Sequence, residues 1–296
     1  MSIRLIIGMF TGLLMLGASA ASTGASTQSA GVADLALNYP ELKIMATGAK
    51  FEMSFRVVAG RYLVSVDNQG QEGVDAQFVK VPEGRTIDQV NRATADPEEN
   101  AAWLYDAIWA GGPTVLAGKQ GQTIIDLTAG NWAILADGYE PSSLLVIPAY
   151  PGSPSRPEPE AAATIQLQEY SFAGLTDSIQ SGKQIWKVTN IGDQPHFLEL
   201  IKAPGKVTSQ QVMDMLMSAG DQSATPAPDA IDPSTIEGVG GIGTISPGQT
   251  GWYITDLEPG TYVALCFVPD RDEGVPHVMM GMVQVFTVGD AANSTL

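Results

Sequence analysis

The sequence predicts an all-β protein made of two tandem Greek-key β-sandwich domains with short inserted helices. Three observations support this prediction: many short β-rich runs with turn residues between them, a pattern that repeats in the two halves, and a proline-rich spacer between those halves. Many short strands with few helices are typical of a β-sandwich. With 296 residues, the chain is long enough for two domains of ordinary size.

The predicted strands are short runs rich in β-branched and aromatic residues. Residues 61–66 and 184–188 each run into an Asn-x-Gly turn, as expected for strands that end at a turn. Further strands are predicted in the second half at residues 197–201, 251–255, 261–267 and 282–288.

A few helices are expected between the strands. Thr86 and Thr208 each open a Thr-x-x-Gln capping box, in which side chains satisfy the free backbone donors at the start of a helix. Another helix is predicted over residues 97–109. The glycine-rich segment 238–243 is not followed by a helix that could bind phosphate, and we interpret it as a flexible loop.

The two halves align with each other at nearly one offset. At a shift of 122 residues, the Asn-x-Gly turn at Asn68 falls on the one at Asn190. At a shift of 130 residues, Trp132 falls on Tyr262, and glycines match at 118 with 248 and at 130 with 260. Because these matches occur in order along the chain, we interpret the halves as two copies of one domain.

The predicted organisation has five parts: a signal peptide at residues 1–20, a disordered N-terminal segment at 21–33, a first domain at 34–150, a proline-rich linker at 151–163 and a second domain at 164–290. The first part has a positively charged start, an apolar run too short to span a bilayer, and the small residues 18–20 as a cleavage pattern. The protein is therefore expected in the periplasm or outside the cell, without a membrane anchor.

The rarest side chains of the protein lie in its second half. The whole chain has two histidines and one cysteine, which are, in order, His196, Cys266 and His277. A methionine group follows at residues 279, 280 and 282. Two imidazoles, a thiolate and a weak thioether are the donors of a mononuclear copper electron-transfer site. Loops at one end of a sandwich can bring such distant residues together.

The spacing of these donors resembles that of the cupredoxin family. The pattern is Cys266-x10-His277-x4-Met282, with His196 just after an Asn-x-Gly turn, and segment 275–282 is similar to the histidine-to-methionine loop of copper-containing nitrite reductases. The resemblance implies one type 1 copper with His196, Cys266 and His277 as equatorial ligands and Met282 as the axial ligand. Met279 and Met280 remain alternatives for the axial position.

The repeat provides an internal comparison for this site. Val74 occupies the place of His196 and Ala136 that of Cys266, so the first copy is expected to be a cupredoxin-like domain without metal ligands. Nitrite reductases and multicopper oxidases need more histidines for a catalytic copper. The protein is therefore expected to be an electron carrier or binding protein and not an enzyme.

Two other functions stay open at this stage: a copper-handling protein for storage or delivery, and a metal-free cupredoxin-like binding module. In the second case Cys266 would be a small buried hydrophobe, and the two histidines would lie on exposed loops. The formal net charge of −17 disfavours binding to nucleic acid. It favours solubility, and a redox partner with a basic docking surface would complement it. The sequence does not predict an oligomeric state.

Overall fold

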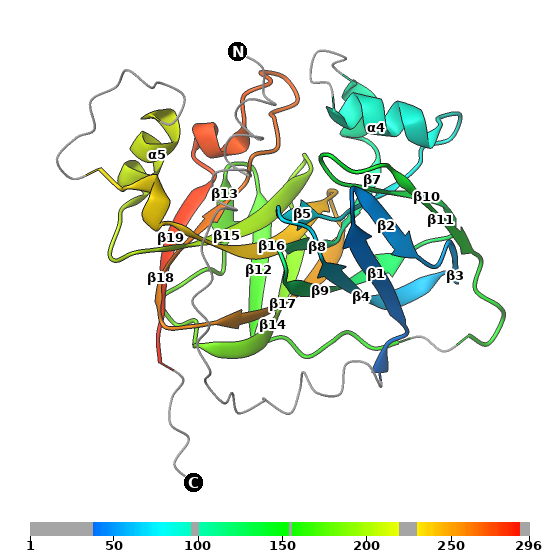
Figure 1. The fold of residues 1–296 in the computed structure, drawn as a ribbon, viewed down its shortest axis with the longest axis horizontal. Coiled ribbons are helices and arrows are strands. Elements are labelled where there is room, and N and C mark those ends of the chain that lie inside the picture. The colour runs from blue at the N-terminus through cyan, green and yellow to red at the C-terminus, as the bar shows by residue number, and fades with distance from the viewer. Residues whose placement is uncertain (1–37, 96–100, 154–155, 219–229, 291–296) are drawn as a thin grey trace, which may run out of the picture.

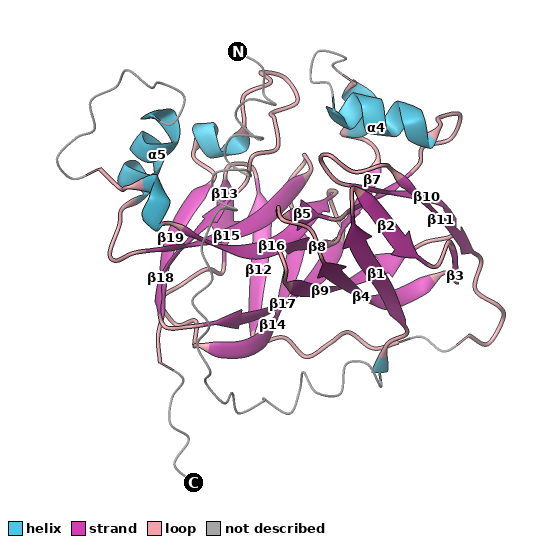
Figure 2. Cartoon of the chain, in the orientation of Figure 1, coloured by secondary structure: helices cyan, strands magenta, loops and turns pink. Residues whose placement is uncertain are grey.

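The structure is a computed structural model that describes residues 38–95, 101–153, 156–218 and 230–290. These residues form mostly strands with few helices, which confirms the predicted all-β class (Figure 2). The predicted signal peptide and the segment 21–33 lie outside the described residues. Among the described residues, no helix combines the length and apolar character needed to cross a membrane.

The elements of the first half are, in chain order, β1 (Glu41–Thr47), β2 (Lys50–Met53), β3 (Arg56–Val58), β4 (Gly60–Asn68), β5 (Val74–Asp75), β6 (Gln77–Lys80), α4 (Ile87–Ala95), the 3-10 helix η2 (Ala102–Leu104), β7 (Ile108–Gly111), β8 (Pro113–Val115), β9 (Gln120–Leu127), β10 (Gly130–Leu135) and β11 (Ser142–Ile147). Those of the second half are β12 (Ala163–Gln168), β13 (Ser171–Ala173), β14 (Gly182–Asn190), β15 (His196–Ala203), α5 (Ser209–Ser218), η3 (Pro233–Thr235), β16 (Glu237–Ile245), β17 (Thr250–Leu257), β18 (Gly260–Leu265), η4 (His277–Met280) and β19 (Val283–Val288).

The described strands form two sheets, and both sheets run through both halves of the chain. One has the order β13-β12-β14-β17-β9-β4-β1-β2, and the other β19-β18-β15-β16-β7-β6-β10-β11-β3, with β8 paired to β16 and β5 to β8. Strands β17 and β9 join the halves in the first sheet, and β16 joins β7 and β8 in the second. In Figure 1 the first half, in blue to green, lies beside the second half, in green to red.

The strand pairing repeats between the halves. Strand β1 pairs parallel to β4 and antiparallel to β2, and β12 pairs in the same way with β14 and β13. In the other sheet, Trp132 lies opposite Lys80 and Tyr262 lies opposite Lys202. Trp132 and Tyr262 are 130 residues apart, and Lys80 and Lys202 are 122 residues apart. The strand register thus reproduces both offsets found in the sequence.

The two Asn-x-Gly turns also have the same hydrogen bonds. The side chain of Asn68 accepts from the Gly70 N–H at 2.9 Å, and that of Asn190 accepts from the Gly192 N–H at 2.9 Å. The amide of Asn68 donates to the carbonyl of Glu72, and the amide of Asn190 donates to the equivalent carbonyl of Gln194. Both asparagines are fully buried, so these bonds satisfy polar groups that water cannot reach.

Each half has its own hydrophobic core between the two sheets. Trp132, Phe78 and Ile125 belong to the core of the first half, and Trp186 and Phe286 to that of the second. A further buried cluster connects the halves across the β9–β17 pairing; it contains Tyr39, Leu63, Ile124, Ile185, Trp252 and Ile254. The halves are therefore packed against each other as well as hydrogen-bonded.

Both predicted capping boxes are present. The backbone N–H of Thr86 donates to Gln89 Oε1 at 2.9 Å, and the N–H of Gln89 donates to Thr86 Oγ1 at 3.2 Å. Thr208 and Gln211 form the same two bonds with the same distances. Helices α4 and α5 start directly after Thr86 and Thr208, as the sequence predicts.

The helix predicted over residues 97–109 is wrong for the described part, residues 101–109. A short 3-10 turn occupies Ala102–Leu104, and strand β7 starts at Ile108. The backbone N–H of Trp109 donates to the buried Oγ of Ser246 at 2.8 Å, and that Oγ donates to Ala107 O at 2.7 Å. Pairing with the second half decides the conformation here, which local sequence preference cannot reveal.

The prediction of a flexible loop at residues 238–243 is also wrong, because this segment lies within strand β16. A Cβ atom at Gly241 would be 2.1 Å from the carbonyl oxygen of Leu198 in β15, and one at Gly240 would be 2.7 Å from that of Thr114 in β8. The glycines therefore permit a close approach of two neighbouring backbones, β15 of the same half and β8 of the other half.

Candidate metal centre

The four predicted ligands lie at or next to the ends of four elements of the second half. His196 is the first residue of β15, Cys266 directly follows β18, and His277 opens η4. Met282 directly precedes β19. All four residues are 0% exposed, so the alternative that the histidines lie on exposed loops is wrong.

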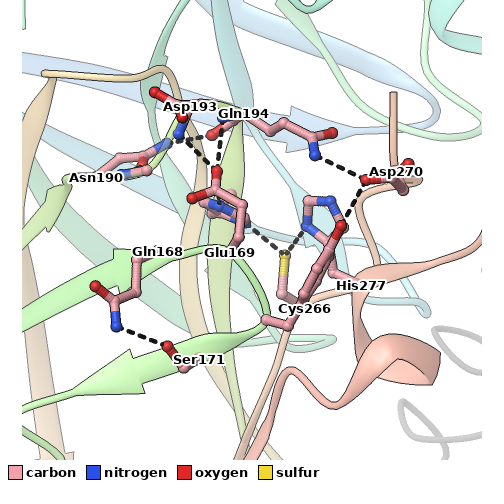
Figure 3. A network of polar contacts seen from close by, with 12 residues as sticks. Gln168, Glu169, Ser171, Asn190, Asp193, Gln194, Cys266, Asp270 and His277 are labelled. Carbon is pink, nitrogen blue, oxygen red and sulfur yellow. Dashed lines mark hydrogen bonds and ion pairs between the residues drawn. The ribbon is translucent and has the colours of Figure 1, made fainter. Parts of the chain in front are cut away.

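The structure brings the two imidazoles and the thiol together. Sγ of Cys266 lies 4.0 Å from Nδ1 of His196 and 3.8 Å from Nδ1 of His277. The ligand atoms of the three residues all lie within 4.8 Å of one another. Figure 3 shows the sulfur of Cys266 facing the ring of His277.

These distances fit a single metal ion. With metal–nitrogen bonds of about 2.0 Å and metal–sulfur bonds of about 2.3 Å, a nitrogen and a sulfur on one ion are about 3.5–3.7 Å apart at trigonal or tetrahedral angles. The observed separations of 3.8 and 4.0 Å are close to this value. Two neutral imidazoles and a thiolate are also the donors that copper accepts in electron-transfer sites. The residues therefore fit copper.

Backbone hydrogen bonds hold the ligand loop in place. The N–H of Val278 donates to the Cys266 carbonyl at 2.7 Å, and the N–H of Met282 donates to the His277 carbonyl at 2.9 Å. The backbone N–H of Phe197 points at the sulfur of Cys266, 3.5 Å away. The two carbonyl bonds thus fix the positions of the donor residues without using their metal-binding atoms.

The three methionines of this segment differ in their packing. Met282 belongs to the buried cluster that contains Cys266. Met279 packs against a different cluster, which lies under helix α5, and Met280 is partly exposed. Of the three, Met282 is the one that shares a buried cluster with Cys266.

Burial sets the charge of the site before any ion binds. It raises the pKa of the Cys266 thiol to about 12, although the N–H of Phe197 partly opposes this effect. Burial, followed by the neighbouring His196, lowers the pKa of His277 to about 4, and burial also lowers the pKa of His196. At neutral pH the three side chains are uncharged, so a cation that binds the sulfur must displace the proton of the thiol.

Asp270 anchors the ten-residue loop between Cys266 and His277. Its Oδ1 accepts from the backbone N–H groups of Asp272 and Glu273 at 2.9 and 2.8 Å. Its Oδ2 accepts from the Tyr170 hydroxyl at 2.8 Å. The same oxygen accepts from the Gln194 amide at 2.7 Å (Figure 3). Burial alone would raise the pKa of this carboxyl, but these hydrogen bonds hold it well below its usual range. Asp270 was not predicted from the sequence.

The first half supports the same loop. The hydroxyl of Tyr105 donates to the carbonyl of Pro269 at 3.1 Å. Arg271 forms an ion pair with Asp106 at 2.8 Å, and its guanidinium lies 5.3 Å from the centre of the Tyr105 ring. The half without the ligand cluster therefore contributes directly to the position of the ligand loop.

One two-residue turn contacts both histidines, and it was not predicted from the sequence either. Glu169 and Tyr170 connect β12 to β13. Oε1 of Glu169 lies 3.4 Å from Nε2 of His196, and the ring of Tyr170 packs edge-on against His277 with 5.4 Å between centroids. Nε2 of His277 is buried and has no hydrogen-bond partner among the described residues.

The equivalent positions of the first half are apolar. Val74 is buried in β5, and Ala136 packs against the core of the first half. Among the described residues, His196, Cys266 and His277 are the one group of three or more His, Cys, Asp or Glu side chains placed to hold a metal ion.

Fold and site together define an all-β protein with one buried cluster of two histidines and a cysteine, and these residue types match those of a cupredoxin type 1 copper centre. No protein-family model matches the chain, and no curated protein does.

Several solved structures of copper proteins show a distant likeness to the chain. Auracyanin from the photosynthetic bacterium Roseiflexus castenholzii has 23% identity, covers 44% of this chain and 99% of its own, and gives a TM-score of 0.27. Auracyanin A, a blue copper protein from Chloroflexus aurantiacus, has 18% identity, covers 43% and 99%, and gives 0.25. The copper-containing nitrite reductase of Thermus scotoductus has 8% identity, covers 86% and 61%, and gives 0.22.

Proposed function

We propose that the chain is an exported protein that transfers electrons through one type 1 copper, held by His196, Cys266 and His277 with Met282 as the axial ligand. The observation that carries this proposal is the cluster itself: three donor atoms from distant parts of the chain lie within 4.8 Å of one another in a fully buried place. A bound copper would supply one-electron redox chemistry at this position.

The surroundings of the cluster favour electron transfer over storage or delivery. Backbone hydrogen bonds on both sides of His277 fix the ligand loop, and Asp270 ties it to the rest of the second half. A fixed set of donors suits an electron carrier, because little has to move when the charge changes. The complete burial of the donor residues also keeps water away from them. A delivery protein would instead need a site that opens to release its ion.

We further propose that residues 34–150 and 164–290 are two cupredoxin-like domains, of which the second holds the metal. The repeated strand pairing and the two equivalent Asn-x-Gly turns support this assignment. We propose a carrier and not an enzyme, because both histidines of the chain are already used in the one site. Export is proposed from the signal-like residues 1–20, and a partner with a basic docking surface from the net charge of −17.

Voltammetry of the copper-loaded protein on an electrode tests the proposal. We expect a reversible one-electron wave in the wild type and in Ala136→Ser, the matched change in the first half, but not in Cys266→Ser. Tight Cu(I) binding without a wave would contradict electron transfer and indicate a copper-handling protein. No copper binding in the wild type would leave a metal-free binding module.

A further inference from the structure

Glu169 lies beside the outer nitrogen of His196, on the side of the ring away from the cluster. Its Oε1 is 3.4 Å from Nε2 of His196, while Nδ1 of the same ring is 4.0 Å from the sulfur of Cys266. His196 is fully buried, and the carboxylate is partly buried, with 31% of its side chain exposed. Both nitrogens of the ring are thus accounted for, one by the cluster and the other by the carboxylate.

The carboxylate itself is held in place by the loop that leads to His196. Glu169 Oε1 accepts from the backbone N–H of Asp193 at 2.6 Å and from that of Gln194 at 2.9 Å (Figure 3). Because Oε1 already accepts two backbone N–H groups, this oxygen faces Nε2 of His196 as a fixed acceptor.

The space for this carboxylate depends on Gly192. A Cβ atom at this position would lie 2.5 Å from Oε1 and 2.7 Å from Oε2 of Glu169, too close for the carboxylate to remain. In the first half, a Cβ at the equivalent Gly70 would meet Asn68 Oδ1 at 3.1 Å and the Tyr139 hydroxyl at 3.3 Å, and no carboxylate. The carboxylate pocket is thus a feature of the half that carries the histidines.

The acceptor decides which ring nitrogen carries the proton. A neutral imidazole has one N–H, and an ionised carboxylate can only accept, so the proton of His196 belongs on Nε2. Nδ1 then keeps its lone pair, and this is the nitrogen that faces the cluster. In many metal sites a carboxylate fixes the tautomer and the orientation of a ligand histidine in this way.

We propose that Glu169 is a positioning residue that fixes His196 in the Nε2–H tautomer and so presents the Nδ1 lone pair to the metal. The role in metal binding rests on the proposed copper function. The tautomer is a property of the metal-free protein, so it can be tested separately. If Glu169 only stabilised the turn at residues 190–194, its removal would affect stability and leave the tautomer unchanged.

The test is 15N NMR of the metal-free protein with labelled histidine, which is simple because the chain has two histidines. In the wild type we expect His196 to have a protonated Nε2 and an unprotonated Nδ1. Glu169→Ala should shift the ring toward a mixture of tautomers, and Glu169→Gln, which still offers an oxygen to accept, should restore most of the wild-type signal. Asp193→Asn is the control, because it removes a charge from the same loop without touching His196.

A second variant removes the contact between Glu169 and His196 while Glu169 itself stays in the sequence. Gly192→Ala should displace the carboxylate and change the His196 signal as Glu169→Ala does, whereas Gly70→Ala, the matched change in the first half, should leave it unchanged. A wild-type His196 protonated on Nδ1, or an unchanged tautomer in both Glu169→Ala and Gly192→Ala, would overturn the inference.

Metal affinity separates this inference from the proposed function. For proteins that bind copper, Glu169→Ala should weaken Cu(II) binding by about 10- to 100-fold, the usual effect of removing such a partner, and Asp193→Asn should have little effect. If the wild type binds no copper while the tautomer shifts as expected, the copper function fails and the tautomer assignment stands. If copper binds but neither Glu169→Ala nor Gly192→Ala changes the tautomer or the affinity, the proposed role of Glu169 fails while the copper function stands.

Discussion

Ala49 and Tyr170 have backbone φ angles of 67° and 60°, and they are the two non-glycine residues with positive φ in the described part of the chain. They occupy the same place in equivalent turns, β1–β2 in the first half and β12–β13 in the second. The repeat has kept an unfavourable backbone conformation in both copies. In the second copy, however, the side chain contacts His277 and Asp270.

The two positions should therefore respond differently to glycine. Ala49→Gly removes the steric cost of a Cβ atom in the left-handed conformation, and it removes no contact with the site. We therefore expect it to raise the free energy of unfolding by up to about 1 kcal/mol. Tyr170→Gly relieves the same conformation but loses the hydroxyl bond to Asp270 and the packing on His277, so it should destabilise the protein. Urea unfolding at neutral pH measures both. Equal stabilisation by the two variants would show that the Tyr170 contacts contribute nothing.

Ser246→Ala tests the hydrogen bonds that join the halves. The buried hydroxyl accepts from the Trp109 N–H and donates to the Ala107 carbonyl, so its removal leaves two buried backbone groups without this partner. We expect a loss of about 1–3 kcal/mol in the free energy of unfolding. Ser153→Ala, on the exposed linker, should change it by less than about 0.5 kcal/mol. A loss in Ser246→Ala no larger than in this control would contradict the role of the bonds.

Glu199 makes the stability depend on pH. Burial, and then the charge of Asp75, raises its pKa from 4.5 to about 7. Because the folded pKa lies above the unfolded value, the folded state binds more protons between the two, and its stability falls as the pH rises through about 7.

Glu199→Gln should remove this effect. The first half already has a glutamine at the equivalent position, Gln77, which lies opposite Leu135 as Glu199 lies opposite Leu265. We expect the variant to be more stable than the wild type at pH 8 by up to about 3 kcal/mol, and to show little difference near pH 4.5. Thermal unfolding between these pH values measures the trend, with the exposed Glu237→Gln as control. A gain of equal size at both pH values would show that ionisation of the buried carboxyl is not its cause.

The axial position can be assigned through the reduction potential of the copper-loaded protein. An oxygen donor stabilises Cu(II) more than a thioether does, so Met282→Gln should lower the potential, while Met282→Leu removes the donor and should raise it. Shifts of about 60 mV or more, a tenfold change in the equilibrium, are expected for Met282. Met279→Leu and Met280→Leu should shift it less. A larger shift in either of these variants would move the axial role to that methionine.

Much of the fold follows from local sequence features. Strands and capping boxes are formed by residues that are close together in the sequence. The two shifts of the repeat are reproduced by the strand register, in which Trp132 lies opposite Lys80 and Tyr262 lies opposite Lys202. The errors at residues 101–109 and 238–243 have a related cause. Strand β7 begins at Ile108 and pairs with β16, which contains residues 238–243 and also pairs with β8 and β15, so contacts between distant parts of the chain determine their structure.

The candidate ligands could be predicted because they are rare. With two histidines and one cysteine in the chain, their spacing is informative. Glu169 and Asp270 could not be found in this way, because they are two among 32 acidic residues. Their roles come from a turn and a loop that meet only in the folded protein. Asp270 receives bonds from Tyr170 and Gln194, which precede it by 100 and 76 residues.

The most direct test of the proposed copper site is a titration of the metal-free protein with Cu(II), followed by visible absorption and electron paramagnetic resonance. We predict one copper per chain, with the intense blue colour of a thiolate–Cu(II) bond. The colour should be lost in Cys266→Ser and in His277→Ala and retained in Ala136→Ser. A wild type that stays colourless with copper bound, or a blue colour that persists in Cys266→Ser, would contradict the assignment of the ligands.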